Sequence, residues 1–186
     1  FPTRRSSDLA ELNASLADER TQTAGKIKSA SAKLASAQEL LREIQAQYKS
    51  ITARVGAGGL THGMNLLLRR KRAELPDPGM YIRSQSELQA EISRVHVRIL
   101  ELEDERKELA HPEAVARQAV IESNPDVSAQ RLGELTAMGL PLARTRLEYT
   151  DSLIRDYGTY FEALLSLSEQ ERQLIESIQA DRKSVV

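Results

Sequence analysis

The stretch LQAEISRVHVRILELEDERKEL, residues 88–109, decides the fold class of this chain. Its apolar residues are separated alternately by four and three positions, and Arg106 interrupts the series: Leu88, Ile92, Val95, Ile99, Leu102 and Leu109. A period of about 3.5 residues puts these side chains on one stripe of a helix, which is typical of a coiled-coil seam. The aliphatic part of Arg106 can lie along that seam while its charged end stays in water. The charged residues at 101–108 accordingly predict a solvated helix face.

The same period recurs on both sides of this stretch. The earlier series is Ile27, Ala30, Leu34, Ala37, Leu41, Ile44, Tyr48, Ile51 and Val55. The later series is Leu153, Tyr157, Tyr160, Leu164, Leu167, Leu174 and Ile178, with Glu171 as a polar member and Phe161 beside it. Alanines in the earlier series predict a close approach of neighbouring helices. Before Ile27 the pattern is weaker, because Leu12 and Leu16 are followed by Glu19 and Thr23.

Clusters of glycine and proline divide the chain into helices, because both residues favour turns or helix ends. They are GAGG at 56–59, PDPG at 76–79, HP at 111–112, NPD at 124–126 and GLP at 139–141. The predicted helices cover about residues 10–55, 60–75, 80–110, 113–123, 127–138 and 142–180. Strand-like alternation of apolar and polar residues does not occur. We therefore predict an all-α protein, an elongated antiparallel helical bundle or coiled-coil arm.

Both ends of the chain can be encoded by one short DNA sequence read in opposite orientations. One orientation encodes Phe1 to Leu9, and the other encodes Asp181 to Val186 followed by a stop codon. This DNA looks like a sequencing adapter left on an assembled read. We therefore expect residues 1–9 and 181–186 to be adapter-derived tails, not native, and residues 10–180 to be a piece of a longer gene.

Composition bounds the kinds of chemistry that this chain can perform. The net charge is -1, whereas a general nucleic-acid binder is usually basic. Cysteine is absent, which excludes disulfides and thiolate metal sites. His62, His96 and His111 have no metal-ligand spacing, and GAGG at 56–59 lacks the spacing of a dinucleotide-binding loop. We expect no enzyme activity, no catalytic or metal-binding residue, no cofactor and no nucleic-acid partner.

The sequence has one local basic cluster, formed by Arg69, Arg70, Lys71 and Arg72. These residues can contact anionic lipid headgroups or nucleic acid. They can equally be the polar part of an amphipathic helix in which Glu74 offers a partner for their charges. The second interpretation is the more economical one, and lipid contact by these four residues is the alternative functional hypothesis.

Three stretches resemble large mechanosensitive channels of the MscS type, which are related to the potassium-dependent channel MscK. They are LLLRRKRAELPD at 66–77, LELEDERKEL at 100–109 and LIRDYGTY at 153–160, followed by Leu164-Leu165 and Arg172-Gln173-Leu174. They occur in the family's order and cover about residues 60–180. Gly139-Leu140-Pro141 departs from the family pattern, which is continuously helical there.

The resemblance implies a homo-oligomeric channel of the bacterial inner membrane that opens when membrane tension rises during osmotic downshock. Residues 10–180 would form a periplasmic helical domain that has a structural or gating-modulating role. The channel would meet the membrane through segments outside this stretch, and no pore residue can be assigned here.

Two other functions fit the same heptads. One is a coiled-coil scaffold protein in the cytosol or the cell envelope. The other is the helical hairpin of an export-pump adaptor, which is also periplasmic. Lipoyl-like β segments next to the helices would favour the adaptor, whereas successive apolar stretches farther along the gene would favour the channel.

Overall fold

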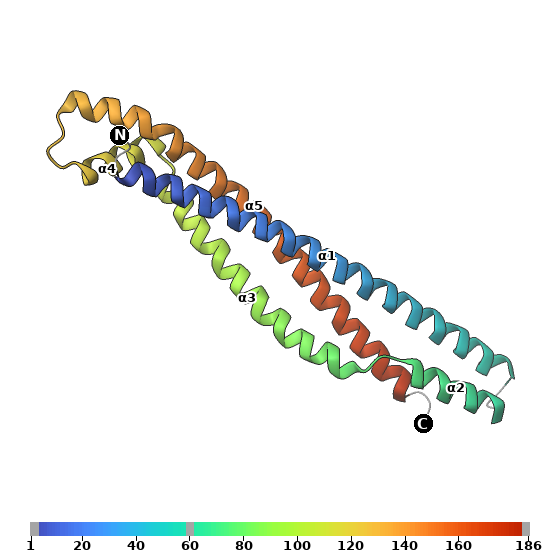
Figure 1. Ribbon diagram of the computed structural model, residues 1–186. Helices are drawn as coiled ribbons and strands as arrows, with labels where there is room; N and C mark the ends of the chain where they lie inside the picture. Colours follow the sequence, from blue (N-terminus) through green and yellow to red (C-terminus); the bar gives the residue numbers. More distant parts are fainter. Residues whose placement is uncertain (1–3, 59–61, 184–186) are drawn as a thin grey trace. The chain divides into compact units, whose positions relative to one another are not determined.

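The computed structural model describes residues 4–58 and 62–183, and every regular element in these ranges is an α-helix. The elements are α1 (Arg4–Gly58), α2 (His62–Glu74), α3 (Pro78–Glu108), α4 (Pro112–Ser123) and α5 (Ala129–Lys183) (Figure 1). The prediction of an all-α fold is therefore confirmed. The helices extend into both stretches that the sequence assigns to adapter DNA, since α1 includes residues 4–9 and α5 includes residues 181–183. The elongated form of the bundle stays a prediction.

Outside residues 139–141, the helix ends lie in or near the turn clusters that predict them. Asp77 precedes α3, and its Oδ1 accepts a hydrogen bond from the Gly79 N–H at 3.1 Å, which satisfies one free donor of the first turn. Pro112 occupies the first turn of α4, where a missing N–H costs little. At the end of α4, the Asn124 N–H donates to the Val120 carbonyl at 2.9 Å.

The predicted break at 139–141 is wrong, because α5 runs without interruption from Ala129 to Lys183 with Pro141 inside it. An internal proline removes one helical hydrogen bond and costs about 3 kcal/mol. Next to the proline, α5 packs on α4. A Cβ added to Gly139 would lie 3.7 Å from the Ala116 Cβ, and Ala143 is fully buried. Small residues thus let α4 and α5 approach closely where the sequence alone favours a kink.

The described chain divides into two compact units, and each long helix contributes to both. Of the described residues, 4–27 and 94–161 form the first unit, and 28–58, 62–93 and 162–183 form the second unit.

In the first unit, α1 and α5 run in the same direction, since residues farther along α1 contact residues farther along α5. Asn13 contacts Leu142, and Arg20 contacts Asp156 farther along both helices. α3 runs in the opposite direction to α5. The core residues of this unit include Leu16, Thr23, Val95, Leu102, Leu109, Ala116, Val120, Ala143, Thr150, Leu153, Tyr157 and Tyr160. Leu12, which stands in the weak part of the predicted pattern before Ile27, is 45% exposed, whereas Leu16 is buried.

In the second unit, α3 and α5 are again antiparallel, since Gln85 contacts Ser168 and Ser84 contacts Glu171. The buried apolar residues here are Ala30, Ala37, Leu41, Ile44, Leu88, Leu164, Leu167, Leu174 and Ile178. All of them belong to the three predicted seams. Tyr48, which the sequence also assigns to a seam, is 44% exposed, and the side chain of Val55 lies outside the described part.

Candidate functional site

Three helices of the first unit meet at one carboxylate, that of Glu19 on α1. Arg98 on α3 donates to it with two nitrogens, Nε to Oε1 and Nη2 to Oε2, both at 2.8 Å. Tyr157 on α5 donates its hydroxyl to Oε1 at 2.7 Å. We call Glu19, Arg98 and Tyr157 the Glu19 cluster. A bidentate arginine–carboxylate pair is among the strongest side-chain interactions, because its planar geometry aligns both hydrogen bonds.

The cluster is partly withdrawn from water, and this changes its acid–base behaviour. The side chains of Glu19 and Arg98 are 24% and 31% exposed. The hydrogen bonds from Arg98 lower the pKa of Glu19, the Tyr157 hydroxyl adds to this effect, and burial opposes it. The same pairing raises the pKa of Arg98, and burial raises the pKa of Tyr157. At neutral pH the cluster is therefore a charged pair with a neutral phenol.

Two further contacts beside the cluster attach α5 to α1. Asp156 accepts a hydrogen bond from Arg20 Nε at 3.0 Å. Lys26 Nζ lies 6.0 Å from the centroid of the Tyr160 ring, at the limit of a cation–π contact. Together with Tyr157, the sequence Asp156-Tyr157-Gly158-Thr159-Tyr160 thus directs three side chains toward α1.

The acidic stretch at 100–109 contacts α5 through two ion pairs. Arg146 pairs with Glu105 through a short contact, and Arg106 Nε lies 2.7 Å from Asp151 Oδ1. Arg106 is exposed, as predicted, whereas its pairing with Asp151 was not predicted. The other charged side chains between 101 and 108 are exposed apart from Glu105, so the predicted solvated face is largely confirmed.

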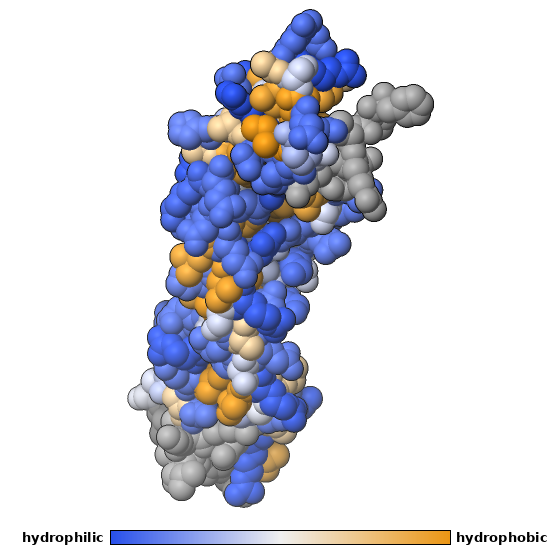
Figure 2. Space-filling model, turned by 90° about the vertical axis from the view of Figure 1, so that its left-hand side faces the viewer, coloured by the Kyte–Doolittle hydropathy of each residue, from blue (hydrophilic) through white to orange (hydrophobic). Residues whose placement is uncertain are grey.

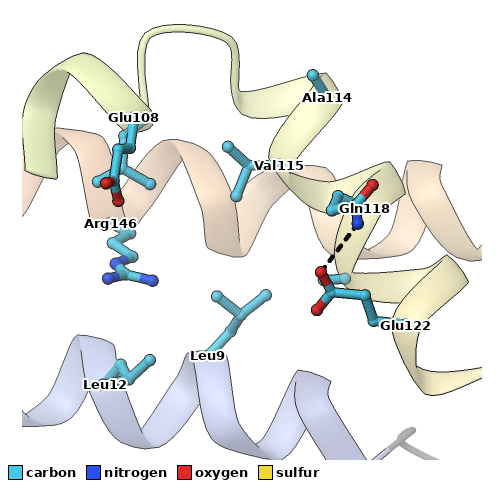
Figure 3. Close-up of a pocket in the computed structure, with 10 residues that line it drawn as sticks. Leu9, Leu12, Glu108, Ala114, Val115, Gln118, Glu122 and Arg146 are labelled. Carbon is cyan, nitrogen blue, oxygen red and sulfur yellow. Dashed lines mark hydrogen bonds between the residues drawn. The ribbon is translucent and has the colours of Figure 1, made fainter.

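A groove of about 700 Å³ lies in the first unit between the start of α1, α4 and α5 (Figure 3). Leu9 and Leu12 line one side, and Val115 faces them from α4. Glu108, Glu122 and Arg146 surround this apolar strip with charge, and Gln118 donates to Glu122 at 2.8 Å. Leu9 belongs to the stretch 1–9 that the sequence predicts to be adapter-derived.

The second unit has its own polar layer, centred on the buried Glu171 of α5. Its Oε1 accepts a hydrogen bond from the Ser84 hydroxyl at 2.9 Å. One turn away, the amide of Gln85 donates to the Ser168 carbonyl at 2.7 Å, and the Ser168 hydroxyl donates back to Gln85 Oε1 at 3.0 Å. Polar residues in a helical seam fix the register of the helices, because a shift would leave them buried without partners.

The predicted lipid-contact residues lie on α2, in the second unit. Arg69 and Arg70 are exposed, whereas Lys71 is half-buried and its Nζ lies 2.6 Å from Glu74 Oε2. Arg70 lies 3.6 Å from the same carboxylate. The side chain of Arg72 is outside the described part. Glu74 is thus the partner that the sequence predicts, and contact with lipid stays a prediction.

Sequence analysis alone does not identify the Glu19 cluster. Glu19 and Thr23 stand where the seam pattern is weak, and that weakness was the available signal. A seam interrupted by polar residues indicates buried hydrogen bonds, as Thr23 shows by donating to the Glu19 carbonyl at 2.8 Å while it is 1% exposed. The partners Arg98 and Tyr157 are 79 and 138 residues away, and local periodicity does not predict such distant pairs.

The surface shown in Figure 2 is mainly hydrophilic, and apolar side chains gather on it in separate small groups. Across residues 4–58 and 62–183, no helix is both long enough and apolar enough to cross a membrane. Within the same ranges, histidine and acidic side chains do not form a group of three or more that could hold a metal ion. Comparison with protein-family models, with curated proteins and with solved structures gave no match.

Proposed function

We propose that this chain is a helical domain from the periplasmic part of an MscS-type mechanosensitive channel, with a structural or gating-modulating role. The observation that carries the proposal concerns the Asp-Tyr-x-x-Tyr phrase, one of the three resemblances to that family. Its Asp156, Tyr157 and Tyr160 all contact α1, at Arg20, Glu19 and Lys26. The phrase thus links one long helix to another in this chain, which supports a mechanical role.

The second family-like phrase supports the same interpretation. In the stretch 100–109, Glu105 and Arg106 pair with Arg146 and Asp151 on α5. Ion pairs between helices resist sliding, because a displacement of a few ångströms separates the charges and leaves partly buried groups unpaired. A domain of this kind transmits displacement instead of absorbing it.

Such a domain can bias a channel without any chemistry of its own. Tension favours the state of the channel that occupies more membrane area, and any domain whose contacts differ between the two states shifts the balance between them. A coupling of about 1–3 kcal/mol, which is typical between linked sites, changes the ratio of open to closed channels by roughly 5–150-fold.

The first test is to read the native gene in frame past the codon for Ala180. Several apolar stretches of about 20 residues, followed by a helix rich in glycine and alanine, would support the channel. A soluble continuation with further heptads would contradict it and favour a coiled-coil scaffold. A neighbouring lipoyl-like β domain would contradict it and favour an export-pump adaptor.

The second test uses the full channel in membrane patches. Deletion of residues 10–180 should change the tension at which half of the channels open, while channels still assemble. Tyr157→Phe, which removes only the hydroxyl, should shift this tension in the same direction by a smaller amount. An unchanged threshold after the deletion would exclude a role in gating.

A further inference from the structure

We propose that one face of α2 docks onto the surface of an anionic phospholipid membrane. The face consists of Gly63, Leu66, Arg69, Arg70 and Ala73, and all five residues are exposed. Their spacing of three and four places them within about a third of the helix circumference. We call this set the α2 face.

The α2 helix has a marked excess of basic over acidic residues. The helix carries four basic residues and one acidic residue. Several exposed basic side chains on other helices have an acidic partner one turn away, as in Arg42 with Glu39, Arg131 with Glu134, and Arg172 with Glu169. On α2 the single Glu74 forms ion pairs with both Arg70 and Lys71, and Arg69 has no acidic partner in the described ranges. The α2 face therefore presents excess positive charge.

Leu66 adds an apolar group to this charge. It is 63% exposed, and it lies one turn before Arg69 and Arg70 on the same side of the helix. A leucine flanked by arginines matches the boundary between phospholipid headgroups and acyl chains, where the leucine is buried and the arginines reach phosphate oxygens. Guanidinium groups bind phosphate with two parallel hydrogen bonds, so two neighbouring arginines can engage two headgroups.

The same features argue against single-stranded nucleic acid as the partner. Proteins that bind it combine basic residues with aromatic side chains on which bases stack. α2 contains no phenylalanine, tyrosine or tryptophan, and Leu66 would stay in water on a phosphate backbone. A lipid surface uses both the charge and the leucine.

The test measures partition of the 186-residue chain onto vesicles at low and at physiological ionic strength. The vesicles are made either of phosphatidylcholine alone or of an equimolar mixture with phosphatidylglycerol. We expect binding to the anionic vesicles that weakens at the higher ionic strength. Arg69→Gln with Arg70→Gln should lower the partition coefficient by about 30-fold, because each basic residue near an anionic surface contributes roughly fivefold.

Two matched controls distinguish binding through the α2 face from effects of net charge and of exposed apolar side chains elsewhere. Arg42→Gln with Arg131→Gln changes the net charge equally, on other exposed helix surfaces, and should cost much less binding. Leu66→Ser should weaken binding several-fold, whereas Met138→Ser, at a residue that is 74% exposed, should not. Circular dichroism of each variant confirms that it is folded.

The proposal is overturned by equal binding to both kinds of vesicle, by no binding at low ionic strength, or by equal losses in the two arginine pairs. Binding to polyuridylate RNA without binding to anionic vesicles would also overturn it and would indicate a nucleic-acid surface. Each of these results leaves the channel proposal standing, because that proposal is tested on the gene and on membrane patches.

Discussion

Arg98 donates to both oxygens of Glu19, so its loss leaves a partly buried carboxylate without its two guanidinium donors. We expect Arg98→Met to lower the free energy of unfolding by about 2 kcal/mol, the range of hydrogen bonds to charged groups. Urea denaturation measures this change. Arg172→Met is the control, because Arg172 is exposed and its ion-pair partners among the described residues, Glu169 and Glu176, lie on its own helix. Its cost should stay below about 1 kcal/mol, and equal losses in both variants would contradict the special role of Arg98.

The Glu19 cluster should also make stability depend on pH. The pKa of Glu19 is lower in the folded chain than its ordinary value of 4.5, chiefly because Arg98 donates to it. Its charge therefore stabilises the fold above about pH 4.5, and this contribution disappears as the pH falls through the folded-state pKa. The difference in urea midpoint between the wild-type chain and Glu19→Gln should thus narrow from pH 6 to pH 3. A constant difference would show that the ionised carboxylate contributes nothing.

At the scale of a single element, α5 contains Pro141 in its interior, on an exposed side. Pro141→Ala restores a backbone donor to the helix, and it should raise the free energy of unfolding by about 2 kcal/mol. Thermal unfolding followed at 222 nm measures the gain. Pro112→Ala is the matched control, since Pro112 lies in the first turn of α4 and should give no gain. Equal gains would mean that the position of the proline inside α5 is irrelevant.

The sequence predicted those features of the helices that are set by residues close together in the chain. The 3.5-residue period identifies the seam around Leu102 and Leu174, both of which are fully buried. The prediction failed at Pro141, where α5 continues as a helix and Gly139 lies beside Ala116 of α4, because local turn signals do not describe contacts between helices. The Glu19 cluster was missed for the same reason: its three members come from three helices, and periodicity describes only one helix at a time.

At the scale of the whole chain, burial is uneven, and backbone protection should follow it. On α5, Leu153, Leu174 and Ile178 are fully buried, whereas α2 exposes the whole α2 face. Hydrogen exchange followed by mass spectrometry should find the slowest amides between residues 153 and 178. The fastest helical amides should lie in α2, because few buried contacts oppose its local opening. Protection of α2 equal to that of α5 would contradict this ordering.

The attachment of α5 to α1 has a consequence for how the chain is made. Glu19 and Tyr157 are 138 residues apart, so Glu19 leaves the ribosome long before its partner is synthesised. At roughly 5–20 residues per second, the interval is on the order of 7–28 s. During that time the part of α1 that packs on α5 faces solvent or chaperones, and its pairing must await the synthesis of α5. Codon changes that slow synthesis between residues 100 and 150 should lengthen this exposed period and increase aggregation of the nascent chain.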